Sequence, residues 1–435
     1  MEFLNWQSGG DVAILALVLY GLVLLGAVAF VARRDASLTR LLPWAFLWHF
    51  IIWLFIAFWM QPHYAALDQA DNYAYHNLGL DTASWIRSGQ WQYVSPDSLG
   101  SDMVPILTGV LYAPFGGDVY GMMFFSACVG LCAAIYFCRA FGLWATPQHF
   151  TSYSRIILFL PSFAVWTSSF GKDSWVSLGL AMSAYGYSAI LKRTGSRGPW
   201  YLAGGMLMVT AIRPHVSLLL SASMAMAFFW GMFRTRRGSL LIKMTTAVLL
   251  VALAGFMTSI TLGFLKIADT SADGVAEYMQ QRESGNFEGG SAVEIEATQG
   301  PIGMLLAFPR GVVRVLFEPF PWEVNGFASA LAGAENIFIL WFVLNSARRL
   351  KGLLRGIGGE PYLLFSVLFA FLILFMLALT PNLGLISRQR AMLLPFLFAP
   401  LVAARAKRTQ DSELVGAAEP LFDYASQAHF ETIRR

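Results

Sequence analysis

The chain has 435 residues, of which 57% are hydrophobic and only 13% are charged. Soluble globular domains carry about 25% charged residues, so this composition excludes an ordinary soluble protein. Repeated apolar stretches of about 20 residues indicate that much of the chain lies in a lipid bilayer. The net charge of +4 gives no reason to expect a nucleic acid partner, because the basic residues cluster beside the apolar stretches.

Two apolar stretches near the start of the chain, 11–32 and 41–60, predict the first two membrane-spanning helices. Arg33 and Arg34 follow the first stretch, and basic residues mark cytoplasmic loops. The polar loop after the second stretch, 61–118, is therefore expected outside the cytoplasm. Its apolar segment 103–117 is too short to cross, and we expect an interfacial or re-entrant helix there.

The remaining apolar stretches continue this alternation of sides, since basic residues follow every second one. A proline after Arg213 divides one long stretch into two helices that meet at the outer face. The acidic second outer loop, 268–334, contains proline-rich apolar segments that we expect to lie at the interface. The later predicted spans are 119–138, 155–170, 174–191, the two halves of 201–233, 240–267, 335–345, 362–380 and 391–404.

These features predict an all-α fold, a polytopic membrane bundle of about 11 transmembrane helices with interfacial or re-entrant helices on the outer face. The amino terminus is expected outside and the carboxyl terminus inside. We expect one membrane-embedded domain at 1–408 and a polar cytoplasmic tail at 409–435. Cys128, Cys132 and Cys138 share one apolar stretch, where they predict helix packing and no disulfide framework.

Several cations lie at the outer ends of the predicted helices, against the usual preference of lysine and arginine for the cytoplasmic side. Lys172 and Asp173, for example, lie in a tight turn between two apolar stretches. Any one cation is compatible with a structural ion pair or with a side chain that reaches the lipid headgroups. A group of cations on one face predicts an anionic ligand such as phosphate, which guanidinium binds with two hydrogen bonds. The group consists of Lys172, Arg213, Arg310, Arg314, Arg388 and Arg390.

The first outer loop contains an acidic segment, ALDQADNYAYHN, in which Asp68 and Asp71 are three residues apart. In a helix these carboxylates share a face, where one accepts a proton from a hydroxyl or both hold a divalent cation. The alternative is a solvated acidic loop, and no other cofactor is predicted. Acids, cations and aromatic rings on one face suit a sugar. Further candidates for substrate binding there are Tyr73, His76, His215 and Glu318.

Three stretches resemble the GT-C superfamily of integral-membrane glycosyltransferases, which use sugars carried on polyprenyl phosphate or diphosphate. They are the acidic loop 67–79, the proline and Phe-Gly segment 101–130, and the segment 160–188 with its Lys-Asp turn. Two basic turns, RPHVSLLL at 213–220 and SRQRAMLLPFLF at 387–398, resemble turns of bacterial exopolysaccharide and O-antigen assembly proteins. The sequence departs from the family in having two spans before the acidic loop and a DxxD pair in place of an acidic doublet.

The resemblance implies transfer of a sugar from a polyprenyl-(di)phosphate donor to a lipid-linked glycan or polysaccharide acceptor. It makes Asp68 or Asp71 the catalytic base, and it places Lys172 and Arg213 on the lipid phosphate. We expect Arg388 and Arg390 to assist there, with Asp173 beside them. The implied location is the inner membrane of a bacterium, with membrane lipids around the bundle and the active site facing the periplasm.

Two other functions fit the same sequence. An O-antigen or exopolysaccharide polymerase or ligase would depend more on the basic turns at 213–215 and 387–390 than on the first-loop aspartates. A transporter of lipid-linked glycans would more often show internal repeats and polar residues at mid-membrane. The polar residues of this chain gather at one predicted face instead.

Overall fold

A computed structural model describes residues 10–33, 35–62, 71–94, 99–234, 255–256, 258–261, 300–324, 327–380 and 382–405. In these ranges the chain is helical and has no β-strand, which confirms the all-α prediction. The segment predicted as the first outer loop holds α4 (Asp71–Arg87), the 3-10 turn η2 (Trp91–Tyr93) and α5 (Met103–Tyr112). The other α-helices are α1 (Gly10–Ala32), α2 (Ala36–Phe55), α6 (Val119–Gly142), α7 (Pro147–Phe159), α8 (Pro161–Ser168), α9 (Lys172–Lys192), α10 (Gly198–Ile212), α11 (Pro214–Arg234), α14 (Gly300–Phe317), α15 (Phe327–Gly356), α16 (Pro361–Ala378) and α17 (Leu383–Arg405). Short turns are the π-helical η1 (Ile56–Met60), which continues α2, and the 3-10 helices η3 (Pro321–Glu323) and η4 (Ile357–Gly359).

Seven helical stretches in the described part of the chain are long and apolar enough to cross a membrane. These helices indicate a multi-pass membrane protein. The total of about 11 spans stays a prediction. α10, at 15 residues, is shorter than a typical span, and most of the predicted span 240–267 lies outside the described residues. The seven are Gly10–Ala32, Ala36–Met60, Val119–Gly142, Pro214–Met232, Ser329–Ser346, Pro361–Ala378 and Leu383–Ala404.

Proline marks the start of several helices, because it fits the first turn of a helix but clashes in the interior. This rule divides 155–170, predicted as one span, into α7 and α8 at Pro161. It also separates α10 from α11 at Arg213 and Pro214, as predicted. The helices that begin in this way are α7, α8, α11 and α16.

The second outer loop differs from its prediction. Pro309 lies inside α14, which continues without a break to Phe317. A proline inside a helix is tolerated where neighbouring helices satisfy the freed backbone groups. The proline-rich end of the segment does stop the helix: α14 ends at Phe317, and η3 begins at Pro321.

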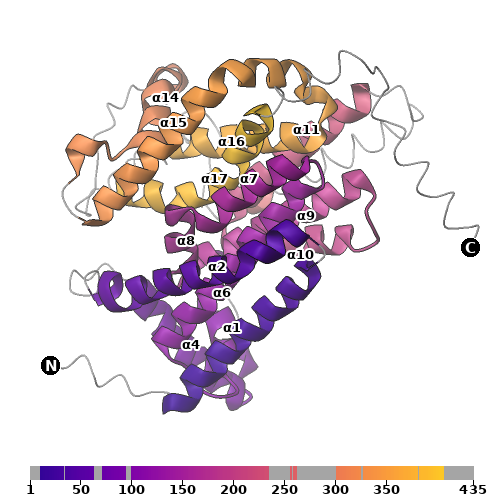
Figure 1. Cartoon of the computed structure of the whole chain (residues 1–435). Coiled ribbons are helices and arrows are strands. Elements are labelled where there is room, and N and C mark those ends of the chain that lie inside the picture. Colours follow the sequence, from indigo (N-terminus) through magenta and orange to yellow (C-terminus); the bar gives the residue numbers. More distant parts are fainter. Residues whose placement is uncertain are drawn as a thin grey trace, which may run out of the picture.

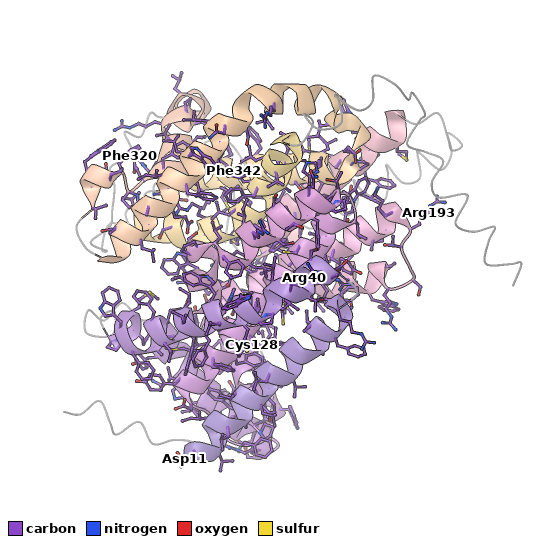
Figure 2. The ribbon with its side chains drawn as sticks, viewed as in Figure 1. Asp11, Arg40, Cys128, Arg193, Phe320 and Phe342 are labelled. Atoms are coloured by element: carbon purple, nitrogen blue, oxygen red, sulfur yellow. The ribbon has the colours of Figure 1, made fainter. Side chains whose placement is uncertain are left out.

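The bundle is built around α6, which is buried along its length and packs against α1, α2 and α9 (Figure 1). Cys128 of α6 lies inside the bundle in Figure 2 and is 3% exposed, as a packing role predicts. In Figure 1, α1, α2, α4 and α6 fill the lower part and α14 to α17 the upper part. α17 packs against α16 and α15 and also reaches α8 and α9, so it connects the late helices to the middle of the chain.

Candidate anion-binding site

Three chain segments far apart in sequence meet around one buried carboxylate. Asp173, in the first turn of α9, accepts a hydrogen bond from Arg213 Nη2 at 2.7 Å through its Oδ1 atom. Its other oxygen, Oδ2, accepts a hydrogen bond from Arg388 Nε on α17. Arg213 is positioned by the break between α10 and α11, where it forms the carboxyl-terminal cap of α10. We call Lys172, Asp173, Arg213 and Arg388 the cation cluster.

The cation cluster has three cations and one carboxylate among its four members. Asp173 and Arg213 are buried, with 1% and 6% of their surfaces exposed. The side chain of Arg388 is 23% exposed, and Lys172 is half-buried. Asp173 therefore holds two arginines in place while Arg388 and Lys172 stay within reach of a ligand. A low-dielectric surrounding strengthens the attraction of such a group for an anion.

The first outer loop contacts this cluster at Lys172. Lys172 Nζ donates a hydrogen bond to Ser101 Oγ at 2.6 Å. The neighbouring Gly100 N–H donates to the carbonyl of Ala211, at the end of α10, at 2.8 Å. These two contacts fix the segment before α5 against both α9 and the Arg213 break.

α4 also reaches the cluster, through Tyr75. The ring of Tyr75 lies 6.3 Å from that of Phe170, measured between centroids. A Cβ atom added at Gly171 would lie 3.3 Å from Arg388 Nη2 and 3.9 Å from Tyr75 Cε2, so glycine permits this close approach. α4 begins at Asp71, one turn before Tyr75, which is about 6 Å along the helix axis.

The predicted catalytic pair is only partly described. Asp71 is the first residue of α4, whereas Asp68 lies outside the described residues. Among the described side chains, no three carboxylates, histidines or cysteines gather as a metal site requires. Both the base and the divalent cation therefore stay predictions.

The other candidates on α4 and α11 have different surroundings. His76 is buried, and its Nδ1 lies 3.0 Å from the hydroxyl of Tyr112 on α5. Burial lowers the pKa of His76, while the negative charge of Asp118 acts in the opposite direction. Tyr73 and His215 are both half-buried, in α4 and in the first turn of α11.

The remaining predicted cations contact other groups, so the expected single set of six is divided. Arg390 is 1% exposed, and its Nη1 donates to Asn336 Oδ1 at 2.6 Å. Arg314 Nε lies 3.7 Å from Glu318 Oε2, one turn later. Burial raises the pKa of Glu318, and the nearby positive charges of Arg314 and Arg310 partly offset this effect. Arg310 is exposed on α14.

Sequence reasoning missed a second buried polar group, which we call the α15 anchor: Ser162, Glu335, Asn336 and Arg390. Glu335 was interpreted as the start of a membrane span and not as a site residue. Its Oε2 accepts a hydrogen bond from the backbone N–H of Ser162 at 2.6 Å, and its Oε1 accepts one from the Ser162 hydroxyl. The signal in the sequence was a carboxylate and an amide, side by side, in the apolar run AENIFILW.

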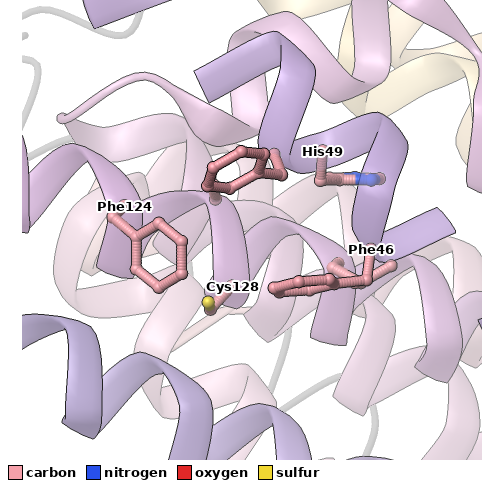
Figure 3. Close-up of a pocket in the computed structure, with 7 residues that line it drawn as sticks. Phe46, His49, Phe124 and Cys128 are labelled. Carbon is pink, nitrogen blue, oxygen red and sulfur yellow. The ribbon is translucent and has the colours of Figure 1, made fainter. Parts of the chain in front are cut away.

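A separate small pocket lies between α2 and α6 (Figure 3). Its one ionisable ring, His49, has Nδ1 2.9 Å from the carbonyl of Ala45, one turn earlier in α2. The lining is otherwise mostly aromatic and aliphatic, which suits a lipid methyl group and not a phosphate. The lining residues are Phe46, His49, Phe50, Phe124, Ala127, Cys128 and Leu131.

Comparisons of the chain with protein-family models, with curated proteins and with solved structures find no match. The functional inference is therefore carried by the chemistry of the cation cluster and its surroundings.

Proposed function

We propose that this chain is a membrane glycosyltransferase whose polyprenyl-phosphate or diphosphate sugar donor binds with its phosphate at the cation cluster. The observation that supports this function is the convergence of Arg213 and Arg388 on Asp173, whose neighbour in the chain is Lys172. Two of the cluster's three cations, Lys172 and Arg388, are partly exposed. Phosphate suits these residue types, because arginine and lysine bind it through charge-assisted hydrogen bonds.

The proposed step is a displacement at the anomeric carbon of the donor sugar. A hydroxyl oxygen of a lipid-linked glycan forms a bond to that carbon, and the bond from the carbon to the phosphate oxygen breaks. The electron pair stays on the lipid (di)phosphate, where Lys172 and Arg388 stabilise the negative charge that develops. Asp68 or Asp71 takes the proton of the attacking hydroxyl.

A polymerase or ligase that joins two lipid-linked glycans is the second candidate. It is favoured by the same arginine pair, since its site is expected to depend on the basic turns at 213–215 and 387–390. The two functions share the phosphate site and differ in the importance of the first-loop acids.

The phosphate site is tested by binding. Purified protein in lipid nanodiscs is titrated with undecaprenyl phosphate, and with undecaprenol, which lacks the phosphate. We expect Arg388→Ala to weaken phosphate-dependent binding about 10–100-fold, the worth of a charge-assisted hydrogen bond, with Arg388→Lys in between. Arg197→Ala removes an exposed arginine near the opposite end of α9 and serves as the matched control. Equal binding by wild type and Arg388→Ala would contradict the proposal.

The two candidate functions are separated by glycan synthesis in a strain that lacks its own copy of the protein. For the transferase, we expect Asp68→Asn or Asp71→Asn to lower the rate about 10²–10⁴-fold, because one proton acceptor contributes that much. For the polymerase or ligase, both aspartate variants keep wild-type synthesis, while Arg213→Ala and Arg388→Ala lose it.

A further inference from the structure

The α15 anchor joins three helices through two neighbouring side chains of α15. Glu335 accepts hydrogen bonds from Ser162, in the first turn of α8, through both carboxylate oxygens. Asn336 accepts a hydrogen bond from Arg390 of α17 at 2.6 Å, and Arg390 Nη2 lies 3.8 Å from Glu335 Oε1. One carboxylate and amide pair therefore holds α8 and α17 at the same time.

Arg390 is buried among the described helices. Its Nη1 also lies 3.4 Å from the carbonyl of Val315 on α14, and 1% of the residue is exposed. Its Nε is buried and has no hydrogen-bond partner among the described residues. A guanidinium in this state is poorly placed to bind a ligand. Burying it is costly, and the best-attested use of a buried polar group is to fix the register of packed elements.

Of the two helices held by the anchor, α17 supplies Arg388 of the Asp173–Arg388 ion pair, and α8 leads into α9, which supplies Asp173. α8 ends at Ser168 and leads through a three-residue turn into α9, where Asp173 is the second residue. Arg388 precedes Arg390 by two residues on α17. In a helix, residues two apart point in different directions, so Arg388 turns to Asp173 while Arg390 turns to α15.

We propose that Glu335 and Arg390 are positioning residues that set the register between Asp173 and Arg388. They hold the guanidinium of Arg388 in the orientation that binds an anion. The ligand in this inference rests on the proposed function; the positioning itself rests on the contacts of the α15 anchor. Arg390 is then a residue of the scaffold and not one of the phosphate-binding groups.

The test uses a charge-balanced double variant, Glu335→Gln with Arg390→Met. The glutamine keeps an acceptor for Ser162, and removing both charges together avoids leaving one buried charge uncompensated. If the ion pair only stabilises the fold, a double variant that melts at the wild-type temperature also binds undecaprenyl phosphate with wild-type affinity. Positioning predicts at least 10-fold weaker undecaprenyl phosphate binding and at least 10-fold faster amide exchange at 383–389, with the melting temperature nearly unchanged. The single variant Arg390→Lys keeps both charges of the anchor, and we expect its affinity to lie between those of the double variant and the wild type.

The control is Arg139→Gln. Arg139 also has a buried guanidinium nitrogen without a partner among the described residues, and its Nη2 donates to Tyr185 on α9 at 3.0 Å. Wild-type exchange at 383–389 in the test variant, or an equal loss of affinity in the control, would overturn the positioning role. If the wild type itself does not bind undecaprenyl phosphate, the proposed function fails, and amide exchange alone decides the role of the anchor.

Discussion

The most informative single residue is Asp173, because it forms ion pairs with two of the predicted ligand-binding arginines. Two arginines on one buried carboxylate are compensated well enough to stay charged, whereas removing Asp173 or the buried Arg213 leaves a poorly compensated charge. Breaking such a buried pair typically costs about 3–5 kcal/mol. Variants of Asp173 or Arg213 therefore report on folding as well as on binding. The partly exposed Arg388 and Lys172 are the better probes of a ligand.

Residue-scale electrostatics also predict a pH dependence at His76. Burial lowers the pKa of His76 below its ordinary value of 6.5, so the unfolded chain binds the proton more readily than the folded chain. The stability that His76 contributes is complete above pH 6.5 and is lost as the pH falls below that value. His76→Gln keeps a hydrogen bond within reach of Tyr112 and does not titrate.

We therefore expect the melting temperature of the wild type to fall more steeply than that of His76→Gln between about pH 7.5 and pH 5. Thermal unfolding of both proteins in the same detergent across this range measures the difference. Parallel curves would show that protonation of His76 has no part in acid sensitivity.

At the scale of elements, glycines determine how closely α9 and α10 pack. A Cβ atom at Gly205 would lie 2.5 Å from the carbonyl oxygen of Gly179, and one at Gly186 would lie 2.7 Å from that of Gly198. The two glycines of each helix are seven residues apart, so the antiparallel helices meet at two matched points. Small residues of this kind let membrane helices approach backbone to backbone. This contact places Asp173 and Arg213 at the same end of the pair.

Gly205→Leu is expected to destabilise the protein by about 1–3 kcal/mol or more, because the close contacts include the backbone atoms Gly179 O and Ser183 N, which do not move aside. Its control is Gly204→Leu on the same helix, where a Cβ atom meets Met182 Cε at an ordinary 3.6 Å. Melting temperatures in detergent compare the two variants. A Gly205→Leu protein as stable as Gly204→Leu would exclude the close helix contact.

At the scale of the whole molecule, the distribution of charge predicts sidedness. The cation cluster and the first outer loop meet at one end of α9, while Lys192 and Arg193 mark its other end. α9 is not among the seven helices that are apolar enough to cross by composition, but its 21 residues span about 30 Å, which equals the thickness of a bilayer core. The two ends are therefore expected in different compartments.

Cysteine labelling measures this sidedness. Ser88→Cys lies in the first outer loop and Ser196→Cys lies in the turn between α9 and α10, and both positions are exposed. We expect a membrane-impermeant maleimide to label Ser88→Cys on intact cells and Ser196→Cys only after the membrane is opened. The native cysteines serve as an internal background, since all three are buried. Labelling of both positions from the same side would remove the basis for an outward-facing enzyme.

Local features of the candidate site were predictable because they depend on neighbours in the chain. Pro214 after an apolar run predicts the break that positions Arg213, and the polar Lys172 and Asp173 predict the turn before α9. The division of 155–170 into two helices was not predicted. The stretch is mostly apolar, which indicates one span, but Pro161 ends the first helix and begins the second. The role of Glu335 was missed because a single carboxylate in an apolar run does not reveal its partners.

The sequence by itself determined that this is an all-helical membrane protein with basic residues at unexpected helix ends, because hydropathy, proline positions and charge are local properties. Only the tertiary structure decided which charges meet. Asp173 pairs with Arg213 and Arg388, which are 40 and 215 residues away, while Arg390 turns to Glu335 instead. Helix packing decides such pairings, since neighbouring residues of one helix face different partners and their sequence positions do not show which partner lies opposite.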